Sequence, residues 1–133
     1  MSQSTMASVA QGVENASGYV TEVDSESDKH DILDALNDDA CRGILDATDE
    51  EALSANELSE ACDLPLSTTY RKLDLLTSVG LLEEDLRVRA SGTHAKEYSR
   101  LVEDVVVSVT PSGDLTLKLC QRDRPERVSV PAY

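Results

Sequence analysis

Apolar residues recur at helical spacing through the first half of the chain and alternate with polar residues through much of the second half. From about Asp28 the helical spacing predicts two short helices, because Asn-Asp-Asp at residues 37–39 suits a break and an N-cap better than a helix interior. The apolar positions of this stretch are Ile32, Leu33, Leu36, Ala40, Cys41, Ile44 and Leu45. Residues 49–51 then form a solvated connection to the next predicted helix.

Residues 54–84, SANELSEACDLPLSTTYRKLDLLTSVGLLEE, have the most informative pattern. Ser54 followed by Glu57 has the spacing of a capping box, so a helix is expected to begin there. Its expected inner face is Leu58, Ala61 and Cys62. Pro65 interrupts this helix, since proline lacks an amide hydrogen and disfavours helical geometry in the residue before it.

A second helix is predicted from about Leu66 to Val79, followed by Gly80 where a left-handed C-cap is wanted. The expected inner face of this helix is Thr69, Leu73, Leu76 and Val79. Two helices with a tight joint are typical of a helix-turn-helix.

Beyond Gly80 the alternating pattern predicts two β-hairpins. In the first, Leu82, Leu86 and Val88 share one face of a strand, Arg87 and Arg89 share the other, residues 90–93 turn, and residues 94–101 return. In the second, a turn at residues 111–114 separates two alternating strands. The alternating residues of these strands are Val105, Val107, Val109, Leu115, Leu117 and Leu119.

The predicted fold class is therefore α+β: a winged helix-turn-helix of three to four helices followed by a β-hairpin wing, with an additional C-terminal β-hairpin. We expect a disordered acidic tail over residues 1–27 and a DNA-binding domain over residues 28–102. The additional hairpin, residues 103–120, is expected to pack on the domain or at a dimer interface. A polar tail follows at residues 121–133.

The distribution of charge along the chain says more about possible binding partners than the formal net charge of −14 does. Residues 1–63 contain sixteen acids and two bases, whereas residues 64–133 contain ten of each. An acidic surface repels phosphate, but here all the excess negative charge precedes the second helix of the motif. Acids exceed bases more than twofold, only four of the twelve bases are Lys, and Phe and Trp are absent. This style is typical of extremely halophilic archaea; the alternative is an acidic bacterial regulator.

Several classes of protein find no support in the sequence. The chain has no apolar run long enough for a transmembrane helix and no secretory signal, so no membrane association and a cytoplasmic location are expected. Three widely spaced cysteines do not suggest a disulfide framework. A Gly-rich phosphate loop, a Ser/His/Asp set and a metal-ligand cluster are all missing, so we expect neither an enzyme nor a cofactor.

The segments ILDALNDDACRGILDAT, ANELSEACDLPLSTTYRKLDLLTSVGLLEE and AKEYSRL resemble the ArsR-like winged helix-turn-helix regulators, particularly those of haloarchaea, over roughly residues 30–101. The resemblance implies a DNA-binding transcription regulator, usually a homodimer that binds a pseudo-palindromic site. Metal-sensing members place a Cys-x-Cys pair near the first helix of the motif, where this chain has only Cys62. Cys62 with Asp63 and His94 would offer a single soft ligand, so no metal site is expected.

In a DNA-binding protein of this kind the second helix enters the major groove. We expect Arg71 to contact guanine, Tyr70 to meet a sugar or a thymine methyl group, and Asp74 to accept from cytosine or to pair with Arg71. Ser67 and Thr68 suit phosphate contacts at the helix start. The full set of predicted DNA-binding residues is Ser67, Thr68, Tyr70, Arg71, Lys72, Asp74, Arg87, Arg89, His94 and Lys96.

Alternatives remain open at this point. Arg71 and Lys72 also fit an ordinary solvated helix face, and the wing arginines also fit an exposed strand paired with the acids at residues 83–85. The alternative function is a protein–protein interaction adaptor of the transcription machinery. For a DNA-binding protein adapted to high salt we predict a shallow dependence of affinity on salt, since counterion release contributes little in multimolar salt. The sequence identifies no effector.

Overall fold

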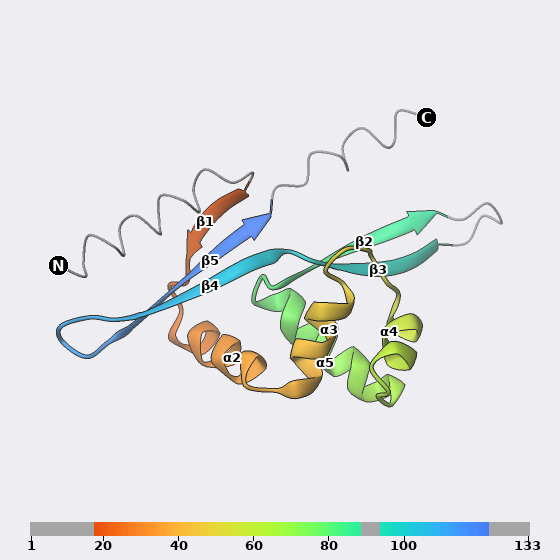
Figure 1. The fold of residues 1–133 in the computed structure, drawn as a ribbon, viewed down its shortest axis with the longest axis horizontal. Coiled ribbons are helices and arrows are strands. Elements are labelled where there is room, and N and C mark those ends of the chain that lie inside the picture. The colour runs from red at the N-terminus through yellow and green to blue at the C-terminus, as the bar shows by residue number, and fades with distance from the viewer. Residues whose placement is uncertain (1–17, 89–93, 123–133) are drawn as a thin grey trace. The chain divides into compact units, whose positions relative to one another are not determined.

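The structure is a computed structural model that describes residues 18–88 and 94–122 (Figure 1). The elements in chain order are β1 (Gly18–Glu22), α2 (Glu26–Leu36), α3 (Asp39–Ala47), α4 (Ala55–Ala61), α5 (Leu66–Ser78), β2 (Leu82–Val88), β3 (His94–Arg100), β4 (Val102–Val109) and β5 (Leu115–Arg122). Four helices, a β2–β3 wing and further antiparallel strands confirm the predicted α+β winged helix-turn-helix.

Side-chain caps fix where the first helices begin. Asp38 is the N-cap of α3, and its carboxylate accepts a hydrogen bond from the Cys41 amide at 3.0 Å. The predicted break at residues 37–39 is thereby confirmed, because an N-cap carboxylate satisfies an amide that has no partner within the helix. The capping box of α4 is also present, with Ser54 and Glu57 each accepting from the backbone amide of the other.

Both helices of the motif end in the same hydrogen-bond pattern. After α5, the Leu81 amide donates to the Leu76 carbonyl and the Gly80 amide to the Thr77 carbonyl, around a left-handed Gly80 with φ of 87°. After α4, the Leu64 amide donates to Ser59 and the Asp63 amide to Glu60. These are Schellman motifs, which need a left-handed residue and usually use glycine. At the end of α4 that residue is Asp63, with φ of 56°.

The core of residues 23–102 is built around the inner face of α5. The predicted inner residues of α5, Thr69, Leu73, Leu76 and Val79, are all buried. They belong to a core whose largest fully buried apolar side chains in this unit are Ile32, Ile44, Leu58, Leu73, Leu76, Leu81 and Leu82. The predicted inner face of α4 was wrong at Ala61, which is exposed; Ala55 is buried instead, because α4 is only two turns long and its first turn faces the core.

The wing is an antiparallel pair in which β2 and β3 run in register from Leu82 opposite Arg100 to Val88 opposite His94. Helices α3, α4 and α5 lie on one side of it (Figure 1). Leu53, just before α4, forms a bridge with Tyr98 of β3 and so ties the motif to the wing. Leu82 and Leu86 lie on the same face of β2, as the alternation predicted, but only Leu82 is buried, whereas Leu86 is 55% exposed. It lies about 13 Å further along the strand than Leu82, toward the tip of the hairpin.

A second sheet has the strand order β1-β5-β4. It contains the predicted additional hairpin, whose turn places Gly113 at φ of 94°. Residues 18–22 had been assigned to a disordered tail, but they form β1, which pairs with β5 from Gly18 opposite Arg122 to Glu22 opposite Lys118. A Cβ at position 18 would lie 2.2 Å from the Gln121 carbonyl oxygen, so glycine is required for this close approach.

The described residues fall into two compact units. One is residues 23–102, which includes the helix-turn-helix and the wing, so it begins a few residues before the expected boundary at residue 28. The other contains β1, β5 and all of β4 beyond its first residue. The expected terminal tails outside residues 18–122 lie outside the described residues. No described helix is both long and apolar enough to cross a membrane.

Candidate nucleic-acid interface

The face of α5 opposite its buried seam is exposed and polar. Ser67, Arg71, Asp74 and Ser78 recur at a spacing of three to four residues and all are exposed. This spacing places them on one side of the helix, away from Leu73 and the core. The structure therefore brings four of the predicted site residues, Ser67, Tyr70, Arg71 and Asp74, to the surface of a single helix.

Arg71 is the cation of this face. Its guanidinium lies 3.5 Å from the Thr68 hydroxyl oxygen, a contact at the outer limit of a hydrogen bond. Within the part of the chain that the structure describes, Arg71 forms no ion pair, and the anticipated pair with Asp74 is not formed. A guanidinium on an exposed helix face with no carboxylate partner is available to a planar acceptor outside the protein.

Lys72 differs from its neighbour because it points back toward the domain. Its ammonium lies 3.1 Å from the carboxylate of Asp38, and its side chain is mostly covered. This hydrogen bond from Lys72, with those from Cys41, holds the pKa of Asp38 below its usual value. Lys72 therefore joins α5 to the N-cap of α3.

The described cations of the wing are paired with acids. The Arg87 Nε lies 3.0 Å from a carboxylate oxygen of Glu97, whose side chain is only 9% exposed. The Lys96 ammonium lies 3.5 Å from Glu84. The acids at residues 83–85 were expected to pair with the wing arginines, but Glu84 pairs with Lys96. His94 is exposed at the start of β3, and Arg89 lies outside the described residues.

Exposed apolar side chains flank the polar face of α5. Tyr70 is 47% exposed, and Leu66 one turn before it is also exposed. Tyr98 of the wing is buried; burial raises its pKa, and the nearby ionisable groups of Glu84, Tyr70 and Asp74 act in the same direction.

The cysteines show the properties of packed hydrophobic residues. Cys41, Cys62 and Cys120 are free thiols; Cys41 and Cys120 are buried, and burial raises the pKa of Cys41 to about 12. Thiolates bind soft metals, and such a shift disfavours the thiolate. Among residues 18–88 and 94–122, no group of three His, Cys, Asp or Glu side chains could hold a metal ion.

Sequence reasoning missed the carboxylates that hold the predicted cations. Asp38 was identified only as a cap, and Glu97 was not identified as a partner of Arg87. The position of Lys72 on α5 contained a signal, because it lies three residues after the buried Thr69 and four before the buried Leu76, and so flanks the buried side of the helix. The cross-strand partners depend on the register of β2 and β3, which the alternating pattern alone does not fix.

Comparison with known proteins agrees with this geometry. Residues 32–85 match a family described as a helix-turn-helix domain. No curated protein matches the chain.

Two solved structures are similar. One is the homodimeric winged helix-turn-helix DNA-binding domain of a possible ArsR-family transcriptional regulator from Mycobacterium bovis, with 22% identity and a TM-score of 0.45 over 56% of this chain and 64% of that chain. The chain thus spans less than two thirds of that structure. The other is a possible transcriptional regulator from Methanosarcina mazei Go1, with 17% identity and a TM-score of 0.43 over 60% of this chain and 73% of that chain.

A helix-turn-helix is a binding module, so this match gives no support to an enzyme. Residues 32–85 are thus similar to a helix-turn-helix domain, and in the structure the strands β2 and β3 follow this segment as a wing.

Proposed function

We propose that this protein is a sequence-specific double-stranded DNA-binding transcription regulator, with α5 in the major groove and the wing along the backbone or the minor groove. The observation that supports this most is the exposed face of α5, where Arg71 has no carboxylate partner among the described residues. An α-helix fits the major groove, and a guanidinium matches the two acceptors of a guanine edge.

The neighbours of Arg71 suit other contacts on the same surface. Tyr70 and Leu66 are exposed apolar groups that fit thymine methyl groups or sugars. Asp74 fits an exocyclic amine of cytosine. Ser67 and Thr68 lie in the first turn of α5, where hydroxyls and helix amides together suit a phosphate.

We also propose a homodimer that binds two half-sites. One helix of thirteen residues touches few base pairs, whereas a two-fold dimer doubles the sequence that is recognised. Light scattering should give twice the chain mass, and protected half-sites should be spaced by about 10 base pairs or a multiple of that. A monomer bound to a single half-site would contradict the dimer.

An adaptor of the transcription machinery is the second candidate. The observation in its favour is that the described wing cations are neutralised by acids while Leu66, Tyr70 and Leu86 are exposed. Such a surface resembles a protein contact more than a phosphate-binding groove.

The test is duplex binding by the parent and by Arg71→Ala and Arg89→Ala. Duplexes selected by the parent from a random library, in both 0.1 M and 2 M KCl, serve as the probe. Loss of specific binding with an unchanged circular dichroism spectrum supports the regulator. Arg42→Ala is the matched control, because Arg42 is an exposed arginine on α3 paired with Asp39, and its removal should leave binding unchanged. Failure of the parent to select any duplex would support the adaptor.

A further inference from the structure

We propose that acidic side chains compete with DNA phosphate for the cations of the wing, so that Glu84, and to a smaller extent Glu97, set the strength and the salt dependence of binding. This inference rests on the proposed function. It identifies these carboxylates as positioning residues: each acts on DNA through the cation that it holds.

The geometry places an acid on three of the four described cations in the predicted site. Lys96 is paired with Glu84 at 3.5 Å, Arg87 with Glu97 at 3.0 Å, and Lys72 with Asp38 at 3.1 Å. Arg71 is the fourth, and within the described residues it has no such pair. The acids come from β2, β3 and the N-cap of α3, so the pairing does not follow from one local sequence motif.

The three pairs differ in how readily they can open. Glu97 is almost fully buried, and therefore holds Arg87 at a fixed place. Lys72 is largely covered by the domain. Glu84 and Lys96 are both substantially exposed, at 43% and 61% of their side chains, so this pair can exchange with solvent and with a phosphate. Glu84 is accordingly the carboxylate whose removal tests the competition most directly.

Counterion release gives the competition a measurable signature. When an unpaired lysine binds a DNA phosphate, it displaces a salt cation that was condensed on the DNA. The released ion makes the binding affinity fall as the salt concentration rises. When a lysine must first separate from a carboxylate, that carboxylate becomes unpaired and attracts a salt cation. This uptake offsets part of the ion release from DNA. Paired cations therefore lower both the affinity and the steepness of its salt dependence.

The experiment compares the parent with Glu84→Gln, Lys96→Gln and the double variant on a duplex selected by the parent. In Glu84→Gln the affinity in 0.05 M KCl should rise about two- to fivefold, the range expected for releasing one exposed ion pair. Between 0.05 M and 0.2 M KCl its affinity should fall up to about 3.5-fold more than that of the parent, which corresponds to one additional phosphate contact. The double variant should lose this gain, because the released lysine is then absent.

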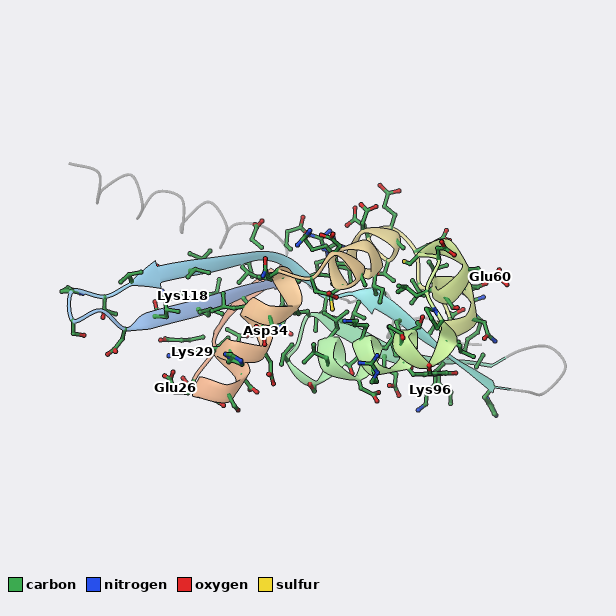
Figure 2. The ribbon with its side chains drawn as sticks, turned by 90° about the horizontal axis from the view of Figure 1, so that it is seen from below. Glu26, Lys29, Asp34, Glu60, Lys96 and Lys118 are labelled. Atoms are coloured by element: carbon green, nitrogen blue, oxygen red, sulfur yellow. The ribbon has the colours of Figure 1, made fainter. Side chains whose placement is uncertain are left out.

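Glu60→Gln is the matched control. Glu60 is exposed on α4, and its substitution removes the same unit of charge without releasing a cation that the structure shows to be paired. Figure 2 shows Glu60 and Lys96 well separated on the domain. Equal affinities and salt slopes for Glu84→Gln and Glu60→Gln would overturn the inference while leaving the proposed function intact. No duplex binding by the parent or by Glu84→Gln would overturn both.

Discussion

Helix α5 and the β2–β3 wing belong to one domain but are built on different principles. Helix α5 has one buried and one exposed face. Thr69, Leu73 and Leu76 are fully buried, and on the opposite side Arg71 is exposed and has no ion-pair partner among the described residues. The wing instead places opposite charges side by side along its strands. Under the proposed function the helix would supply recognition, whereas the wing supplies a surface that is nearly neutral where the structure describes it.

The largest expected contrast is between one leucine of each region. Leu73→Ala should lower the free energy of unfolding by about 2–5 kcal/mol, because it leaves a cavity in a fully buried site. Leu86→Ala in the wing should change it by less than about 0.5 kcal/mol, because Leu86 is mostly exposed. Urea unfolding of both variants measures the contrast. Similar losses would mean that the wing contributes to the core as much as α5 does.

A second contrast concerns DNA. Arg71→Ala should weaken binding to a selected duplex about 5- to 150-fold and reduce discrimination at one base pair, because a bidentate base contact is lost. Arg87→Ala should have a smaller and sequence-independent effect, since Arg87 is already held by Glu97. Fluorescence anisotropy with matched and singly mismatched duplexes distinguishes them. Loss of discrimination in Arg87→Ala would reverse the roles assigned to helix and wing.

The third contrast is between helix capping and wing charge. Ser54→Ala should cost about 1 kcal/mol of stability by removing the capping box of α4. Ser54→Asp keeps an acceptor at the N-cap and should therefore retain most of the stability that Ser54→Ala loses. Lys96→Gln in the wing should cost less than about 1 kcal/mol, because its ion pair is exposed. Thermal unfolding measures all three, and a wing variant less stable than Ser54→Ala would contradict the ranking.

The smallest expected effect depends on pH. The pKa of Asp38 is lowered in the folded state, chiefly by the hydrogen bond from Lys72. The unfolded chain therefore binds a proton more readily, and the stability from this group is complete above about pH 3.9 and is lost as the pH falls through the folded-state pKa.

Lys72→Gln should reduce this acid-dependent part of the stability. Urea unfolding at pH 6 and pH 3 measures it, with Lys118→Gln on β5 as a control that removes the same charge elsewhere. An identical pH dependence in Lys72→Gln and the parent would show that the Lys72–Asp38 pair is not formed in solution.

Local patterns predicted the parts of this fold that local chemistry determines. The capping box at Ser54, the break at Asp38, the buried seam of α5 and the left-handed Gly80 were all readable from spacing. Strand β1 was missed because GYVTE is short and its partner β5 lies about a hundred residues away along the chain. The residue pattern of a five-residue strand does not indicate a partner so far away in the sequence.

The exposure of side chains on α5 was predictable from the sequence, but the ion pairs of the candidate site were not. Arg71 and Tyr70 were placed correctly on an exposed face, since helical spacing fixes their direction. The engagement of Lys72 by Asp38 depends on how α5 packs against α3, and that of Arg87 by Glu97 depends on strand register. Neither is encoded in a single segment.

Every residue between α4 and α5 takes part in ending the first helix or starting the second, with Asp63 as the left-handed residue. The Schellman motif of α4 uses residues up to Leu64, and α5 starts directly after Pro65. An inserted residue would have to be absorbed by α5, where a shift of one position turns every side chain by about 100° around the helix. Arg71 would then leave the exposed face and Leu73 would leave the core. Divergence among chains of this kind should therefore proceed by substitution on the exposed face of α5, while the length of residues 62–65 stays constant.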